Sequence, residues 1–273
     1  MQKIGFSLQS SYSLPMTDVL RLLRDIGFHA VSPGWTRDGI LHTILETAAQ
    51  CGLCIQSLHG PLRGLPSMWS RDDAASLLRD FMDAADVCAA YDIPILVVHA
   101  WTGLDYTFHK DTLYFDNFDR LVAHAHNQGV QIAFENLEGP EYLAALMDRY
   151  ADCPDVGFCW DSGHEHCYTP SWDFLKLYGD RLLMTHLNDN FGITDPNGIL
   201  RGTDDLHLLP FDGNLDWTDS IHRLKQARPQ EILNFEFKIR PKGDRCTADL
   251  YSKLPLVQYL ATAYQRASRV AAI

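Results

Sequence analysis

Residues 131–164 read QIAFENLEGPEYLAALMDRYADCPDVGFCWDSGH and contain the unit from which the fold can be predicted. Two short apolar runs, Gln131–Glu135 and Val156–Asp161, are rich in residues that favour β-strands. Between them, Glu141–Tyr150 spaces its apolar residues three and four positions apart, which is typical of an amphipathic helix. Strands separated by a helix pair in parallel, because the helix returns the chain to the end at which the first strand began. The stretch therefore predicts a strand–helix–strand unit of a parallel sheet.

The same alternation continues over the whole chain of 273 residues. Strand-like runs are Ile4–Leu8, Ala30–Ser32, Cys54–His59, Ile95–His99, Gln131–Glu135, Val156–Asp161, Leu182–Leu187 and Ile232–Glu236. Helical patterns cover Met16–Asp25, Leu41–Gln50, Asp72–Tyr91, Asn117–Asn127, Glu141–Tyr150, Asp173–Tyr178, Trp217–Lys225 and Leu250–Arg266. No glycine-rich phosphate-binding turn follows the first strand, which disfavours an open dinucleotide-binding sheet. The pattern predicts an α/β fold, a single (β/α)8 TIM barrel, and with no linker visible we expect one domain over residues 1–273.

The composition is that of an ordinary globular protein, with 46% apolar and 21% charged residues. No run approaches the roughly 20 apolar residues of a membrane helix, and a strand-like sequence begins at Lys3, so we expect neither an anchor nor a signal peptide. Seven cysteines are an odd number, and no second pair completes a zinc site around Cys51 and Cys54. These features favour reduced thiols and a cytoplasmic location.

Side chains of metal-ligand type end six predicted strands in succession: His59, His99, Glu135, Asp161, His186 and Glu236. The active site of a TIM barrel lies at the C-terminal ends of its strands, so these side chains should meet at one opening. Taken singly, each is more readily explained as a hydrogen-bonded turn residue. Several carboxylates at one opening repel one another unless a cation is bound, so the set as a whole predicts a divalent-metal site.

Two local spacings and one long connection add further candidate ligands. Asp161-Ser-Gly-His164 places an imidazole three residues after a strand end, and His186-Leu-Asn-Asp189 reverses that order. Residues 188–216 lack clear periodicity, and a connection of that length is uncommon unless it covers a site. Within it, Asp205-Leu-His207 offers two more ligand types, whereas Asp216 is at least as well explained as a helix N-cap.

Five motifs fall on successive strands and on the connection between the last two: Ile132–Asn136, Cys159–His164, Thr185–Asp189, Pro210–Trp217 and Phe235-Glu236. Together these motifs resemble those of the xylose-isomerase-like TIM-barrel superfamily of sugar isomerases and epimerases. The resemblance covers nearly the whole chain, because the motifs fall in the expected order on successive strands. Two departures concern the substrate: Phe211 follows Pro210 where a glycine is usual, and Phe191-Gly192 replaces an arginine.

The resemblance implies one divalent ion held by Glu135, Asp161, His186 and Glu236, with His164 in contact with the substrate. Three carboxylates and an imidazole suit Mn²⁺, Mg²⁺, Co²⁺ or Zn²⁺. We expect such an ion to polarise the carbonyl of a ketose or related polyhydroxy ketone and to favour an enediolate. Glu135 and Glu236 would then move the proton, and the choice between epimerisation and isomerisation stays open.

The same superfamily contains apurinic endonucleases with three zinc ions, and nine residues match their ligands: His59, His99, Glu135, Asp161, His164, His186, Asp205, His207 and Glu236. A multi-zinc phosphodiesterase is therefore the alternative function, and a catalytically silent binding barrel is a third. The endonucleases use basic loops on DNA. With 35 acidic and 23 basic side chains and a formal charge of −12, this chain shows no comparable basic concentration, so we do not expect a nucleic-acid partner.

The expected partner is a small sugar or polyol, with no membrane partner and with homo-oligomer formation left open. Arg63 and Asp189 are candidate substrate contacts beside His164. Each tryptophan named here is more readily explained as a core residue than as a wall for the apolar side of a sugar. The tryptophans concerned are Trp35, Trp69, Trp101 and Trp160, of which Trp101 is the candidate substrate contact.

Overall fold

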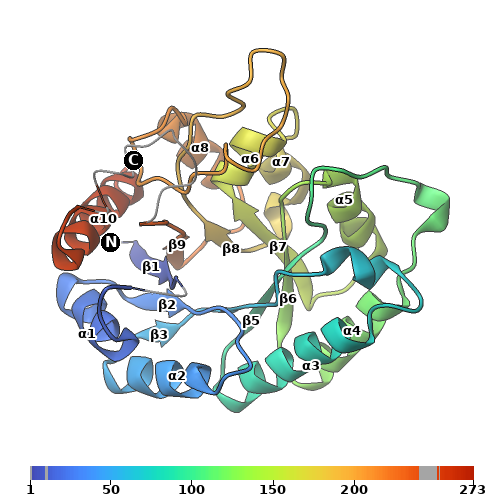
Figure 1. Ribbon diagram of the computed structural model, residues 1–273, viewed down its shortest axis with the longest axis horizontal. Coiled ribbons are helices and arrows are strands. Elements are labelled where there is room, and N and C mark those ends of the chain that lie inside the picture. The colour runs from blue at the N-terminus through green and yellow to red at the C-terminus, as the bar shows by residue number, and fades with distance from the viewer. Residues whose placement is uncertain (1, 10–11, 240–250, 252) are drawn as a thin grey trace.

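The computed structural model describes residues 2–9, 12–239, 251 and 253–273. Parallel strands lie at the centre of the molecule and helices surround them (Figure 1). The strands form two sheets, one in the order β3-β2-β1-β9 and one in the order β4-β5-β6-β7-β8. Their bounds are β1 Lys3–Ser7, β2 Ala30–Ser32, β3 Cys54–Ile55, β4 Leu58–His59, β5 Ile95–His99, β6 Gln131–Glu135, β7 Val156–Asp161, β8 Leu182–His186 and β9 Ile232–Phe235.

Isolated bridges join the two sheets at both of their edges. At one edge Gly34 bridges His59, whose carbonyl accepts a hydrogen bond of 2.7 Å from the amide of Trp35. At the other edge Leu187 bridges Phe235, and the amide of Leu187 donates to the carbonyl of Asn234 at 2.9 Å. The sheets therefore curl into one barrel, which confirms the predicted fold class.

The predicted strand Cys54–His59 is wrong as a single element. Its first part, β3, pairs with β2, and its second part, β4, pairs with β5 in the other sheet. At the bend, Ser57 turns its hydroxyl into the barrel and hydrogen-bonds Ser32 at 3.0 Å. The chain thus passes from one sheet to the other where the sequence shows an unbroken run.

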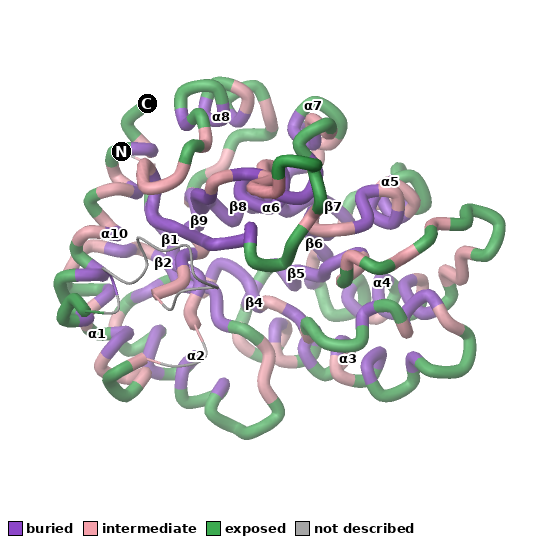
Figure 2. Tube along the Cα trace, turned by 45° about the horizontal axis from the view of Figure 1, so that its top comes forward, coloured by how far each residue is buried: buried purple, intermediate pink, exposed green. Residues whose placement is uncertain are grey.

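Helices cover the outside of the barrel, and their outer faces are exposed (Figure 2). One short helix, α6 (Ser162–Tyr168), was not predicted; it starts directly after β7, and Asp161 caps it by accepting a hydrogen bond from the amide of His164. The predicted helix Leu250–Arg266 begins outside the described residues. The other helices are α1 Met16–Ile26, α2 Ile40–Gln50, α3 Ala75–Ala90, α4 Asp116–Asn127, α5 Pro140–Arg149, α7 Phe174–Tyr178, α8 Trp217–Leu224 and α10 Leu256–Ala271, with short 3-10 turns η1 Leu65–Trp69, η2 Lys110–Thr112 and η3 Gly179–Arg181.

Alternation along the strands divides the buried residues into two sets. One set packs between the strands and the helices, and the other fills the barrel, because successive strand residues face opposite sides of a sheet. Within the five-stranded sheet the barrel filling is apolar, and within the other sheet it is a hydrogen-bonded network of Ser7, Ser32 and Asn234. The apolar filling consists of Ile95, Val97, Ala133, Cys159 and Met184. The next inward position on each of these strands is a candidate metal ligand.

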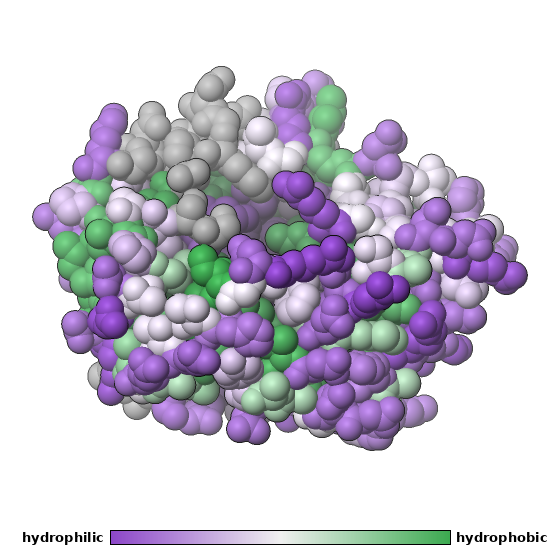
Figure 3. Space-filling view, turned by 60° about the horizontal axis from the view of Figure 1, so that its bottom comes forward, coloured by the Kyte–Doolittle hydropathy of each residue, from purple (hydrophilic) through white to green (hydrophobic). Residues whose placement is uncertain are grey.

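The surface carries no extended apolar band on the face seen in Figure 3, where hydrophilic residues predominate and hydrophobic ones appear in small groups. No helix in the described part of the chain is long and apolar enough to cross a membrane.

Candidate metal centre

Strand register brings the predicted ligands to one level. His99 pairs with Glu135 across β5 and β6, and Asp161 pairs with His186 across β7 and β8. Glu236 directly follows β9 and completes the group. One donor atom from each of Glu135, Asp161, His186 and Glu236 lies within 4.8 Å of the others. His186 Nδ1 stands between two carboxylates, 3.0 Å from Glu135 Oε1 and 3.1 Å from Glu236 Oε2.

Hydrogen bonds hold Asp161 in place. The side-chain amide of Asn188 donates to both of its oxygens, at 3.1 and 2.9 Å, and the amide of His164 donates to Oδ1 at 2.7 Å. Gly163 makes this approach possible, because a Cβ at that position would lie 1.9 Å from Asn188 Oδ1. The glycine of the Asp161–His164 motif therefore serves close packing around the carboxylate.

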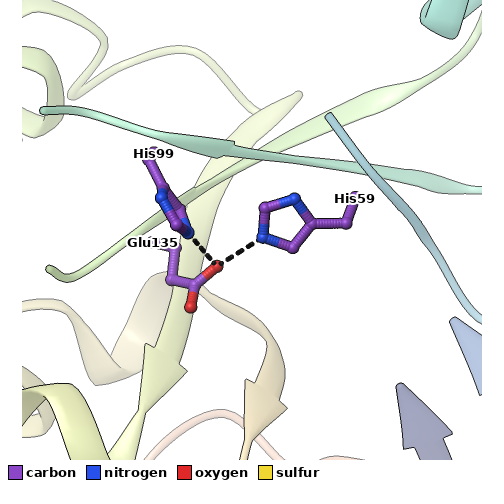
Figure 4. A group of neighbouring side chains, drawn as sticks. All are labelled: His59, His99 and Glu135. Atoms are coloured by element: carbon purple, nitrogen blue, oxygen red, sulfur yellow. Dashed lines mark hydrogen bonds and ion pairs between the residues drawn. The ribbon is translucent and has the colours of Figure 1, made fainter. Parts of the chain in front are cut away.

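A second group contains His59, His99 and Glu135. Both imidazoles point at the same carboxylate oxygen, Glu135 Oε2, from which His99 Nε2 lies 3.0 Å and His59 Nε2 lies 3.3 Å away (Figure 4). The other nitrogen of His59 is bonded to the carbonyl of Gly60 at 3.0 Å, which fixes the ring. Glu135 thus presents one oxygen to this group and the other to His186.

The third group contains His164, Asp205 and His207. Asp205 Oδ1 lies 2.9 Å from His207 Nε2 and 3.6 Å from His164 Nε2. The opposite ring nitrogens are bonded to backbone carbonyls, His164 to Asn136 and His207 to Glu236, each at 3.0 Å. His207 has a φ of 49°, a left-handed backbone that a residue with a side chain adopts at some cost. That cost indicates that the loop is shaped to present this imidazole.

The electrostatics of the centre are dominated by burial and by the contacts between carboxylates and imidazoles. Burial by itself would raise the pKa of Glu135, but His186 and His99 outweigh it and hold the pKa well below the usual range. Burial would also raise the pKa of Glu236, but His186 and His207 outweigh burial and lower that pKa to about 2. In His164 burial lowers the pKa, but Asp161 and Asp205 raise it to about 10. The carboxylates of Glu135 and Glu236 are therefore charged, whereas burial raises the pKa of Asp161 above its ordinary value.

The side chains present fit a divalent cation. Glu135 Oε1 and both ring nitrogens of His186 are buried, and none of their close contacts with described residues has hydrogen-bond geometry. Buried polar atoms in this state are costly unless an ion or water satisfies them. Carboxylate oxygens and imidazole nitrogens are suitable ligands for Mn²⁺, Co²⁺ or Zn²⁺.

A cavity of about 530 Å³ opens above these groups. This volume lies within the range of roughly 300–1,000 Å³ that is usual for small-molecule sites. Its wall combines apolar residues, among them Trp35 and Leu62, with the polar groups of Ser7, Glu138 and Lys238. His59, His99, His164, Asp205, His207 and Glu236 also line it.

Two of the predicted substrate contacts, Asp189 and Arg63, are not among the described residues that line the cavity. Asp189 is fully buried, and both its oxygens are occupied: the amides of Phe211 and Leu215 and the indole of Trp217 donate to them at 2.9 to 3.1 Å. It therefore holds the long loop after β8 together instead of facing the cavity. Arg63 is exposed and is not among the described residues that line the cavity.

Trp101, a third predicted substrate contact, is likewise absent from the described residues that line the cavity. Its ring stacks on Tyr142 at 4.2 Å between centroids, and its indole donates to the carbonyl of Gly103. Trp69 and Trp160 are core residues, as the prior expectation favoured, whereas Trp35 lines the cavity. Cysteines 51 and 54 are both free thiols.

Sequence reasoning missed Asn188, Cys159 and Glu138. Cys159 could have been found from strand alternation, because it stands two residues before Asp161 on the same face. Asn188 and Glu138 lie in connections, where no periodicity shows which side chains turn inward.

Comparison with known families decides the relationship that these motifs indicated. Residues 20–252 match the family model of the xylose isomerase-like TIM barrel. The chain belongs to this family. The sequence relative y4fM, an uncharacterised protein of Sinorhizobium fredii, is 36% identical over 182 residues, which is 62% of this chain and 54% of that protein. The chain thus spans about half the length of this relative.

Solved structures show the same fold at low sequence identity. IolI protein with a bound zinc atom is 19% identical and has a TM-score of 0.75, with 98% of this chain and 97% of that chain covered. The 3-keto-D-glucoside 4-epimerase YcjR of E. coli is 16% identical, has a TM-score of 0.66 and covers 97% and 100%. D-psicose 3-epimerase in the presence of D-fructose is 15% identical, has a TM-score of 0.70 and covers 98% and 97%. These structures therefore share the fold of this chain.

Proposed function

We propose that this protein is a divalent-metal-dependent isomerase or epimerase of a ketose or related polyhydroxy ketone. One observation carries the proposal: Glu135 Oε1 and Glu236 Oε2 both lie within 3.1 Å of His186 Nδ1, and Glu236 lines a cavity of small-molecule size. Two of the solved structures that share the fold are sugar epimerases. In this proposal residues 1–273 form one domain, and Glu135, Asp161, His186 and Glu236 hold the ion.

A bound divalent ion would polarise the substrate carbonyl and acidify the neighbouring C–H bond. The chain's own groups move the proton. Glu135 and Glu236 approach from β6 and from the end of β9, and their pKa values lie below the usual range, so both are deprotonated at neutral pH and available as bases. Abstraction by one carboxylate and return on the opposite face gives epimerisation, whereas return on the same face at the adjacent carbon gives isomerisation.

His164 is placed to orient a substrate hydroxyl. Its ring is buried, lines the cavity and is fixed by the bond from Nδ1 to the carbonyl of Asn136. Its Nε2 points toward Asp205, so the protonated imidazole can donate a hydrogen bond to a hydroxyl while the ionised carboxylate accepts one from it.

Deuterium incorporation tests the proposal. The metal-loaded protein is incubated in heavy water with a panel of ketoses, including D-fructose and D-tagatose, and label at the carbon next to the carbonyl is measured. We expect labelling that Glu236→Gln abolishes and that Glu46→Gln, a change at an exposed helical position, leaves unaltered. Absence of label in every ketose, in protein shown to contain metal, would remove enolisation from consideration and favour a silent binding barrel.

A second candidate function is a multi-zinc phosphodiesterase related to apurinic endonucleases. It is favoured by the two additional groups, His59–His99–Glu135 and His164–Asp205–His207, which a one-metal enzyme does not need. Against it, Lys238 is the only lysine or arginine among the described residues that line the cavity. Metal analysis discriminates between the two functions: one ion per chain favours sugar chemistry, and three ions with cleavage of an abasic DNA strand favour the phosphodiesterase.

A further inference from the structure

Cys159 lies among the candidate ligands in a way that the proposed mechanism does not use. It is fully buried in β7 and pairs in register with Glu135 on β6. Its Sγ, a ring nitrogen of His186 and a carboxylate oxygen of Glu135 all lie within 4.8 Å of one another. Because it precedes Asp161 by two residues, its side chain is on the same inward face, one layer deeper in the barrel.

The surroundings of this thiol change character from one side to the other. It belongs to an apolar cluster with Val97, Ala133 and Met184, yet its Sγ also lies near the buried carboxylate of Glu135 and the imidazole of His186. Packing alone does not require sulfur at this boundary, since an alanine occupies the inward position of the neighbouring strand. What the sulfur adds is a soft donor beside two hard ones.

His186 supplies the second observation. Its ring is 1% exposed, and neither nitrogen makes a hydrogen bond of good geometry with a described residue. Zinc bonds of roughly 2.0–2.3 Å to nitrogen and sulfur put tetrahedral ligands about 3.5 Å apart. The donor atoms of Glu135, Cys159 and His186 now lie within 4.8 Å of one another, and small side-chain rotations are enough to bring them to that spacing.

We propose that Glu135, Cys159 and His186 form an inner metal position for a thiophilic divalent cation such as Zn²⁺ or Cd²⁺. The inference rests on the proposed metal site, because Glu135 and His186 serve both positions. On binding, the S–H bond breaks, the sulfur keeps the electron pair as a thiolate ligand, and the proton leaves to solvent. Mg²⁺ and Mn²⁺ prefer oxygen ligands and stay at the mouth. Since two ligands are shared, an ion in the inner position keeps a catalytic ion out.

Titration of metal-free protein with Co²⁺ and Cd²⁺ tests the inner position. Cys51 and Cys54 are first replaced by serine, because they are accessible to metal. We expect a thiolate-to-Co²⁺ charge-transfer band in this parent protein and in Cys88→Ser, a matched change at a buried thiol of α3. Cys159→Ser should abolish the band and weaken Cd²⁺ binding by about tenfold or more, while Mn²⁺ binding changes by less than about twofold.

Three results would overturn the inference: no band in the parent, a band that persists in Cys159→Ser, or equal weakening of Cd²⁺ and Mn²⁺ by that substitution. A protein that binds Mn²⁺ and exchanges ketose protons but gives no band loses the inner position alone. A protein that binds neither ion loses both proposals. If Cys159→Ser does not fold, X-ray absorption spectroscopy of the Cd²⁺-loaded parent protein decides. A sulfur ligand on Cd²⁺, with the Cd²⁺ displaced by excess Mn²⁺, supports the inner position. A ligand shell of oxygen and nitrogen alone refutes it.

Discussion

Replacing Asn188 by alanine should weaken metal binding although Asn188 is not itself a ligand. Its side-chain amide donates to both oxygens of Asp161 at 3.1 and 2.9 Å, and both residues are fully buried. The amide therefore fixes the direction in which the carboxylate presents its remaining lone pairs. In Asn188→Ala the carboxylate keeps the amide of His164 as a donor and gains freedom to rotate.

Two effects set the magnitude. Loss of a residue that orients a metal ligand typically costs 10- to 100-fold in metal affinity, so we expect the Kd for Mn²⁺ to rise by about that factor. Hydrogen bonds to charged groups contribute roughly 1.5–3 kcal/mol each, and two bonds from one amide to one carboxylate add incompletely. We therefore expect the free energy of unfolding of the metal-free protein to fall by about 2–3 kcal/mol.

Calorimetric titration with Mn²⁺ measures the first effect, and urea unfolding of the metal-free protein measures the second. Asn127→Ala, at an exposed position near the end of α4, is the matched control and should change neither quantity appreciably. An Asn188→Ala protein that binds Mn²⁺ with wild-type affinity would refute the reasoning, because Asp161 would then be oriented by other groups or would not be a ligand.

Three further outcomes are expected. In the metal-free protein, Cys159, Glu135 and Glu236 outweigh burial and hold the pKa of His186 well above its ordinary value, so a proton must leave when the metal binds. Metal affinity should therefore rise with pH, and titrations in buffers of different ionisation enthalpy should detect the released proton; a pH-independent Kd would argue against His186 as a ligand. Asp189→Ala should lower the free energy of unfolding by about 3 kcal/mol, since it removes the acceptor of several buried donors; an unchanged denaturation midpoint would contradict the structural role assigned to this residue. Removal of metal by a chelator should stop proton exchange into a ketose, and restoration by Mn²⁺ should recover it; a metal-free protein with full activity would end the metal-dependent mechanism.

The barrel and the meeting of its strand ends could be predicted because each depends on a regular pattern. Period-two alternation on the strands fixes which side chains face inward, and parallel strands bring their C-terminal ends to one opening. Glu135, Asp161 and His186 follow from that rule alone. That these residues bind a metal ion stays a prediction, since the structure shows that their side chains lie close together and does not show a bound metal.

Residues in connections could not be predicted in the same way. The amide of Asn188 and the carboxylate of Asp189 are adjacent in sequence and equally polar, yet one orients a candidate ligand and the other ties the loop after β8 to Phe211 and Trp217. Their directions depend on loop backbone angles that tertiary contacts decide. The bend at Ser57 divides one apolar run between two sheets, and it could not be predicted from the sequence for the same reason.

The carboxylate of Glu135 links two coordination environments, with one oxygen facing His59 and His99 and the other facing His186. An ion drawn to either oxygen redistributes charge over both, so loading on one side alters affinity on the other, and this influence is reciprocal. If ions bind on both sides of Glu135, they will therefore bind stepwise with unequal constants. The number of ions bound per chain would then depend on their free concentration as well as on the protein.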